Sequence, residues 1–306
     1  MRPREGVVAD VGRLRSVREA GLLVACTLAA VGLTASGGIL PAAGQSSTDV
    51  LLHATALSYQ DSEVKEQGWV AGFYGTYGSG WKHLVEVGAT RTGIDYVDGW
   101  ELRQTDVAGA YGYYGASGAV RAGAHFISGN DPLSDGGVVL FGGASRYRVG
   151  VWSAGTEGAL SSYGSYNEGL TVVQVAPSAG VTRTAAEGRH VMGATLRGYW
   201  IRVSRDVGLR SRSFLSGEAS VSYTSGRLSL SGFAWAGEQA FAVRAGGFTV
   251  FNLAELHTGG LGGGVRWVLS SRSALSVGYS LERFEDMGLA SRAWTRALSA
   301  SIGLTL

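Results

Sequence analysis

Few side chains of this sequence are spaced for catalysis. Its 306 residues include five histidines and a single cysteine, Cys26. No group of His, Cys or carboxylate residues has the spacing of a metal site. The glycine-rich stretch 259–264 lies in a predicted strand with no helix after it, so it lacks the context of a phosphate-binding loop. We therefore predict no catalytic residue, no metal site and no cofactor.

A second set of charged and polar residues has a spacing that suits a different chemistry. These residues lie in stretches where apolar and small polar residues alternate, so their side chains are predicted to share one face of a strand. In a closed barrel this face is the lumen, where the charges form either a mixed-charge pore lining or an ion-pair network that closes the barrel. The predicted lumen-lining residues are Glu86, Gln104, Asp106, Arg121, His125, Arg148, Glu218, Arg266 and Glu282.

The elements that position these residues are predicted to be β-strands. In the last segment, 292–306, large apolar residues at even positions oppose small Ala, Ser, Gly and Thr residues at odd positions. Similar alternation appears around Ala219, Val277 and Ala122. Segments of about ten alternating residues separated by turn residues are the signature of a transmembrane β-barrel. A soluble β-sandwich also alternates, with its apolar faces packed together.

Composition favours the membrane alternative. The polar faces are mainly Ser, Gly and Thr, whereas a soluble surface would carry more Lys and Glu, and the chain has 49 Gly and only 4 Pro. Residues 1–44 hold an excess of Arg over acidic residues, which leaves the rest of the chain with balanced charge. A balanced chain offers no electrostatic basis for binding nucleic acid.

The first 44 residues are predicted to be a secretory signal peptide. A basic stretch precedes the apolar run 20–39 and the small residues Ala42, Ala43 and Gly44, so cleavage is expected between Gly44 and Gln45. A transmembrane helix is the first alternative, because the run is long enough to span a bilayer. A lipoprotein signal at Cys26 is the second, although the apolar segment before Cys26 is short.

The remaining residues, 45–306, are predicted to form one antiparallel transmembrane barrel of about 14 strands, with 12 or 16 as alternatives. Short and long connections alternate along the chain, as in outer-membrane barrels. The loop 129–135, with Asn130, Asp131 and Asp135, suits a plain turn better than a Ca²⁺ site, and the region 237–256 either folds into the pore or binds a partner. The predicted strands are 49–59, 66–77, 81–93, 99–113, 118–128, 136–144, 146–157, 168–183, 189–204, 213–224, 226–236, 257–269, 273–284 and 292–306.

Three resemblances to known families bear on function. The alternating final strand resembles the closing strand of bacterial outer-membrane barrels, which the assembly machinery reads, although Leu306 replaces the usual terminal aromatic residue. The stretch Leu84–Asn130, with Arg91, Gln104, Asp106 and the run Arg121-Ala122-Gly123-Ala124, resembles the YaiO-type outer-membrane barrel family, which implies a location rather than an activity.

The stretch that begins at His257 faintly resembles the His-x-Ser-Asn motif of outer-membrane lipid-A deacylases, but Gly259 stands where that motif has Ser. A catalytic histidine needs a nucleophile within hydrogen-bond distance, and the sequence pairs none with His257. The sequence thus favours an outer-membrane pore or transport channel for small solutes. A closed structural, assembly or surface-interaction barrel is the main alternative, and a lipid-modifying enzyme is a weaker one. Expected partners are outer-membrane lipid, lipopolysaccharide and the barrel-assembly machinery.

Overall fold

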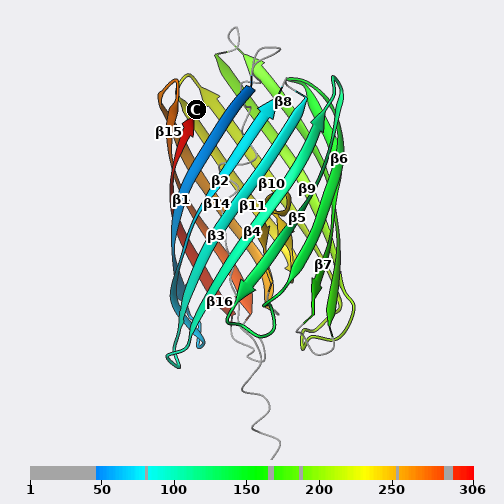
Figure 1. Cartoon of the computed structure of the whole chain (residues 1–306), viewed down its shortest axis with the longest axis vertical. Coiled ribbons are helices and arrows are strands. Elements are labelled where there is room, and N and C mark those ends of the chain that lie inside the picture. The colour runs from blue at the N-terminus through cyan, green and yellow to red at the C-terminus, as the bar shows by residue number, and fades with distance from the viewer. Residues whose placement is uncertain (1–45, 80–81, 165–168, 186–188, 253–254, 286–291) are drawn as a thin grey trace, which may run out of the picture.

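The chain forms a closed antiparallel β-barrel of 14 strands (Figure 1). This computed structural model describes residues 46–79, 82–164, 169–185, 189–252, 255–285 and 292–306. The predicted fold class is confirmed, and the predicted signal peptide lies outside the described residues. The wall strands are β1 (Ser46–Gln60), β2 (Lys65–Ser79), β3 (His83–Tyr96), β4 (Glu101–Tyr114), β5 (Gly118–Gly129), β6 (Val138–Arg148), β7 (Trp152–Tyr163), β8 (Leu170–Ala185), β9 (His190–Val203), β10 (Ser213–Ser225), β11 (Leu228–Gln239), β14 (Leu256–Ser270), β15 (Ser273–Glu285) and β16 (Arg292–Thr305).

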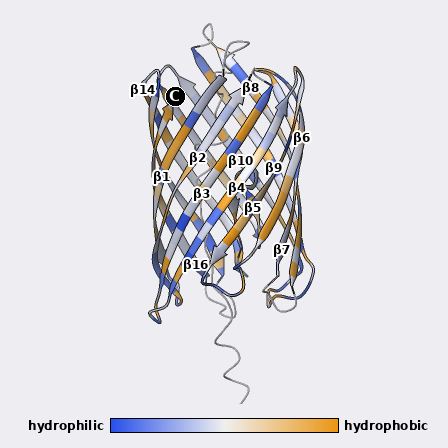
Figure 2. Ribbon diagram, in the orientation of Figure 1, coloured by the Kyte–Doolittle hydropathy of each residue, from blue (hydrophilic) through white to orange (hydrophobic). Residues whose placement is uncertain are grey.

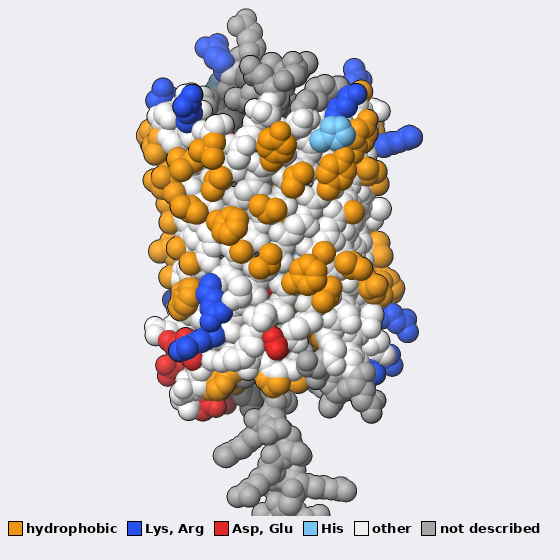
Figure 3. Space-filling model, in the orientation of Figure 1, with side chains coloured by type: hydrophobic (Ala, Val, Ile, Leu, Met, Phe, Trp, Pro, Cys, Tyr) orange, Lys and Arg blue, Asp and Glu red, His pale blue; other side chains and the backbone are white. Residues whose placement is uncertain are grey.

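Alternation along each strand produces two unlike faces. At the centre of β16 the side chain of Leu298 is 57% exposed on the outside, whereas that of Ala297 is 3% exposed. Figure 2 shows the hydrophobic and hydrophilic residues alternating along the strands. On the face that Figure 3 shows, apolar side chains are spread over the wall, and Lys and Arg lie towards its two ends. In an outer-membrane barrel such an apolar outer surface faces lipid. No helix in the described part of the chain is long and apolar enough to cross a bilayer.

Every wall strand pairs with its neighbour in sequence, except where three short elements are inserted between β11 and β14. These are β12 (Val243–Arg244), the 3-10 turn η2 (Ala245–Gly247) and β13 (Thr249–Val250). β11 nevertheless pairs directly with β14 from Leu228↔Trp267 to Gln239↔His257. β1 pairs with β16 and closes the barrel.

The two ends of the barrel differ in their connections. β1 begins and β16 ends at the same end, which we call the terminal end, since Asp49 pairs with Thr305. Tight turns such as 226–227 and 271–272 join strands there, whereas longer segments such as 130–137 and 204–212 join them at the opposite end, the loop end. Short turns mark the periplasmic side of outer-membrane barrels, so the terminal end corresponds to the periplasmic side.

One predicted turn was misplaced. The sequence placed a break at residue 145, between predicted strands 136–144 and 146–157, but β6 continues to Arg148 and the turn lies at 149–151. Gly150 takes a φ of +70° there, and the Val151 amide donates to the Arg148 carbonyl at 2.9 Å. A left-handed conformation suits Gly, so Gly150 marks the turn better than Ser145 does.

Candidate functional site

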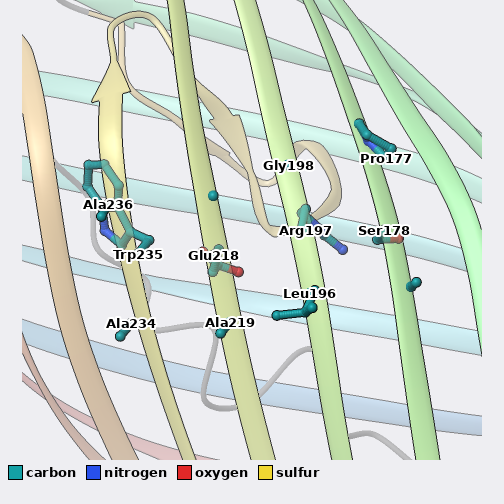
Figure 4. A pocket seen from close by; sticks show the side chains of 12 residues that line it. Pro177, Ser178, Leu196, Arg197, Gly198, Glu218, Ala219, Ala234, Trp235 and Ala236 are labelled. Atoms are coloured by element: carbon teal, nitrogen blue, oxygen red, sulfur yellow. The ribbon is translucent and has the colours of Figure 1, made fainter.

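The lumen is occupied by a segment of the chain itself. We call residues 240–252, which follow β11, the inner loop. Ala240, Phe241, Phe251 and Asn252 in it are each at most 2% exposed. Its contacts, given below, come from inward-facing residues of the wall, and Figure 4 shows the hairpin of β12 and β13 behind β9 and β10. Of the two alternatives for region 237–256, the structure shows folding into the pore.

Two side chains of β5, Arg121 and His125, hold the tip of the inner loop. The Arg121 guanidinium donates to the Gly246 carbonyl, and His125 Nδ1 lies 2.9 Å from the Gly247 carbonyl. Both tip glycines have positive φ, +61° and +97°, and a Cβ at Gly247 would overlap the Phe141 ring. Only glycine fits both the backbone and the space here.

Neighbouring polar side chains support this contact from the wall. His125 Nε2 lies 3.1 Å from Asp106 Oδ1, and Gln104 Nε2 donates to both Asp106 oxygens at 2.9 Å. Gln104 Oε1 in turn accepts a 2.6 Å hydrogen bond from Asn252 of the inner loop. Glu86 accepts from Arg121. The result is a continuous polar network between the wall and the loop.

Arg244 is the main charged anchor of the inner loop. Its guanidinium donates to Glu218 of β10 and, at 3.3 Å, to Glu282 of β15. It also lies 5.5 Å from the ring centre of Trp235 and 5.9 Å from that of Tyr199. We call Glu218, Glu282, Tyr199 and Trp235 the arginine cage. Carboxylates and aromatic faces both attract a guanidinium.

Two further contacts fix the ends of the loop. The Gln174 amide pairs with the Val243 backbone in both directions, at 2.6 and 2.9 Å, much as a neighbouring strand would. Near β14, Lys65 forms a buried ion pair with Glu255 and lies over the Phe284 ring at 4.9 Å. The loop is therefore held by side chains of the wall rather than by the wall's own ladder.

Most of the predicted lumen-lining residues lie around the inner loop. Arg266 has the inward parity but is exposed and has no hydrogen bond to the loop in the described residues. Arg148 is placed differently from the prediction, because it has the parity of outward-facing Leu140 in the longer β6 and lies exposed at the terminal end. The residues that surround the inner loop are Glu86, Gln104, Asp106, Arg121, His125, Glu218 and Glu282.

Sequence reasoning missed the loop's own anchor, Arg244, and the wall residues Gln174 and Lys65. The only local signal was weak: region 237–256 contains strand-like pieces between two alternating segments. Lys65 is one of just two lysines in the sequence, and its surroundings in the sequence do not indicate a lumen position.

The lumen differs between its two halves. Towards the loop end of β16 the inward residues Ala293, Thr295 and Ala297 are buried, whereas Ser299 and Ser301, nearer the terminal end, are partly exposed. β8 shows the same change from buried Leu170 to partly exposed small residues after Ala176. A polar vestibule thus opens from the terminal end towards the inner loop.

A hollow of about 680 Å³ lies at the wall formed by β8 to β11 (Figure 4). Small residues on the outer face, among them Gly198, Gly217 and Ala236, leave this space, and the inward-facing Glu218 and Trp235 also line it. The hollow therefore lies mainly on the outer face of the wall, whereas Arg244 contacts the arginine cage from the lumen.

His257 is not placed for catalysis. It is buried, its ring stacks on Phe251 at 4.5 Å, and its nearest charged neighbour is Glu282 at 3.7 Å. The adjacent Thr258 hydroxyl accepts a hydrogen bond from Arg283. No hydrogen bond links His257 to a hydroxyl among the described residues, so the triad arrangement required of a histidine base is missing here.

The loop 130–137 forms a turn without a metal site. Asp131 accepts hydrogen bonds from the Leu133 and Ser134 amides and from the Ser134 hydroxyl, and Asp135 accepts one from the Gly129 amide. No group of three or more metal-binding side chains occurs in the described residues. These carboxylates stabilise the turn locally.

A closed 14-strand barrel with an apolar outside and a polar, partly filled inside defines the class of outer-membrane β-barrels. No protein-family model and no curated protein matches the sequence.

Solved structures of the same architecture do match. The chain is similar to the CymD monoaromatic hydrocarbon channel, with 9% identity, a TM-score of 0.54 and coverage of 86% of this chain and 89% of that one. It is similar to the toluene transporter TbuX of Ralstonia pickettii, with 11% identity, a TM-score of 0.51 and coverage of 86% and 89%. A bacterial polysaccharide outer-membrane secretin matches with 9% identity, a TM-score of 0.51 and coverage of 84% and 98%. At such identities the likeness shows the fold alone.

Proposed function

We propose that this protein is an outer-membrane channel for small solutes and that its inner loop is the gate. The observation that carries the proposal is the direct pairing of β11 with β14. Because this ladder is continuous without residues 240–252, the loop can leave the lumen while the wall stays closed. A barrel of about 14 strands is wide enough to hold water once its interior is free.

The polar contacts of the inner loop suit a movable element. They are hydrogen bonds and ion pairs to individual side chains, such as those of Arg121, Gln174 and Glu218. Water can replace such partners during opening, so each net contribution is modest. The apolar residues of the loop, among them Phe241 and Phe248, are buried in one hydrophobic cluster with wall residues, and opening must separate them. The polar vestibule would give solutes access to the loop from the periplasmic side.

The structural relatives are consistent with this proposal. Two of them are described as a monoaromatic hydrocarbon channel and a toluene transporter, and a third as a polysaccharide secretin. Their names give different cargoes, so the proposal extends to channel function and not to a cargo. The same proposal includes four further points. Residues 1–44 are cleaved as a signal peptide, the barrel contacts lipopolysaccharide, the barrel-assembly machinery inserts it, and the chain is a member of the YaiO-type family.

A closed structural barrel is the second candidate. The buried ion pair of Lys65 with Glu255 and the network around Asp106 favour it, since breaking buried charged contacts is costly. The two candidates differ in whether the inner loop ever leaves the lumen.

The test is a planar-bilayer recording of a variant in which a short Gly-Ser linker replaces residues 241–252. Gln239 and His257 are paired neighbours, so a short connection can join β11 to β14. The matched control replaces residues 205–211 of the β9–β10 connection with the same linker. We expect large, steady conductance steps from the inner-loop variant and smaller, intermittent ones from the wild type and the control. If an inner-loop variant that shows a heat-dependent gel shift conducts no ions, the channel proposal fails.

A further inference from the structure

We propose that the arginine cage is a binding site for small solutes that carry a guanidinium group. Arg244 is its built-in occupant, and such a solute competes with Arg244 and thereby releases the inner loop. This inference rests on the proposed channel function, because it assigns the gate a ligand.

The cage belongs to the wall and its occupant does not. Tyr199 is on β9, Glu218 on β10, Trp235 on β11 and Glu282 on β15, whereas Arg244 is on the inserted β12. When the loop leaves, all four cage residues stay together on the barrel. The site is therefore preformed, which reduces the ordering that a ligand must undergo on binding.

The chemistry of the cage selects a planar cation. Two carboxylates share one guanidinium, with Arg244 Nη2 on Glu218 and Nη1 on Glu282. The rings of Trp235 and Tyr199 lie within 6 Å of the same carbon atom, Cζ. A guanidinium offers paired donors to carboxylates and a flat face to aromatic rings, whereas a hydrated ammonium or alkali cation offers no flat face.

Vacating the cage leaves two neighbouring carboxylates without the cation that they share. With the loop in place, the Glu282 side chain is 1% exposed and that of Glu218 is 13% exposed, and both contact the one guanidinium of Arg244. Once the loop leaves, water reaches both carboxylates, but their like charges still repel each other. A soluble cation that enters as Arg244 leaves would reduce this repulsion.

A ligand reaches the cage from the lumen, because the side chains of Tyr199, Glu218, Trp235 and Glu282 have the inward parity of their strands. The space for it is the space that Arg244 and the inner loop vacate. The neighbouring Arg197 is paired with Glu157 at 3.4 Å. The tethered Arg244 has an effective concentration on the order of millimolar, so a competing solute must reach a similar concentration.

The experiment measures binding of N-ethylguanidinium, the fragment that Arg244→Ala removes, to the folded full-length barrel in detergent by calorimetry. N-ethylurea, which has the same shape without charge, is the control probe. Arg210→Ala is the matched control variant, because Arg210 also contacts two glutamates, Glu238 and Glu285, but without aromatic rings and with its side chain 53% exposed. The Gly-Ser replacement of 241–252 is tested beside it, so that a folding failure of Arg244→Ala leaves the inference testable.

We expect saturable millimolar or tighter binding of N-ethylguanidinium to Arg244→Ala and to the loop replacement. We expect much weaker binding to Arg210→Ala, in which Arg244 competes for the cage, and no binding of N-ethylurea. Adding Glu282→Gln to Arg244→Ala should weaken binding at least tenfold, roughly the effect of losing one charged hydrogen bond. No saturable binding to either folded variant that lacks Arg244, or equal binding with Glu282→Gln, overturns the inference.

A second readout tests competition in the intact gate. Thr249, on the inner loop, is 3% exposed, so Thr249→Cys is a reporter whose maleimide labelling depends on loop release. N-ethylguanidinium should accelerate its labelling several-fold, and potassium chloride at equal ionic strength should not. Equal acceleration by both would contradict displacement of Arg244.

Conductance of the loop replacement is recorded separately. Binding without conductance would refute the channel alone, and conductance without binding would refute the cage alone.

Discussion

Gly247→Ala should release the inner loop, because the loop tip depends on a residue without a side chain. Gly247 has a φ of +97°, and a Cβ there would overlap the Phe141 ring. A left-handed conformation costs an alanine about 1–2 kcal/mol. Overpacking against a fixed ring costs a further ~1–3 kcal/mol. If the tip withdraws to relieve both, it also loses its contacts with Arg121 and His125.

Gly136→Ala is the matched control. Gly136 has a φ of +72°, but a Cβ there would meet nothing within 4 Å, and the residue lies in the 130–137 connection rather than in the inner loop. Its backbone cost therefore does not favour release of the inner loop. Gly247→Ala should favour release by the sum of its two costs, about 2–5 kcal/mol, which corresponds to a roughly 25- to 4000-fold larger population of released loop.

The assay is the rate of maleimide labelling of Thr249→Cys in the two backgrounds, divided by the rate of an exposed reporter, Ser271→Cys, on each variant. We expect Gly136→Ala to label at the rate of the parent and Gly247→Ala to label faster by the stated factor. Equal rates in the two variants would show that the tip does not depend on its contact with Phe141.

Two further predictions test the membrane face and a loop. Leu298→Arg, at the outward-facing centre of β16, should destabilise the barrel in lipid by about 2–4 kcal/mol, whereas Ser299→Arg, which points into the lumen, should not; equal losses in chemical unfolding would refute the assigned faces. Burial raises the pKa of Asp131 against opposing hydrogen bonds from Ser134 and Leu133, so the folded loop binds a proton that the unfolded chain has lost. The stability of the wild type relative to Asp131→Asn should then fall as the pH rises from about 4 to 7, and thermal unfolding that shows a constant difference would exclude this.

The wall could be predicted because its pattern is local. Each strand needs only alternation and a turn residue, and both are visible within about ten residues of sequence. The misplaced turn at 145 shows the limit of this reasoning: Gly142, Gly143 and Gly150 are equally plausible local signals, and pairing across the sheet decided between them. Arg148 was assigned to the wrong face as a consequence. Side chains alternate between the two faces, so a misplaced strand boundary puts the residues after it on the opposite face from the one predicted.

The inner loop could not be predicted in the same way. Arg244 finds its partners Glu218 and Glu282 26 and 38 residues away, and Gly246 meets Arg121 125 residues away. A local periodicity in the sequence does not indicate contacts between residues that are so far apart along the chain. The sequence did indicate that Glu218, Glu282 and Arg121 would share an interior, but it left open whether water or protein would meet them there.

The separation between wall and inner loop has a consequence for how the protein tolerates change. Strand pairing holds the cylinder together, and a handful of side chains determine whether its interior is blocked. Mutation of the inner loop or of its partners can therefore change how firmly the interior is blocked, in small steps, without disturbing the strand pairing of the wall. Two melting events are expected on heating, first departure of the blocking segment and later collapse of the cylinder.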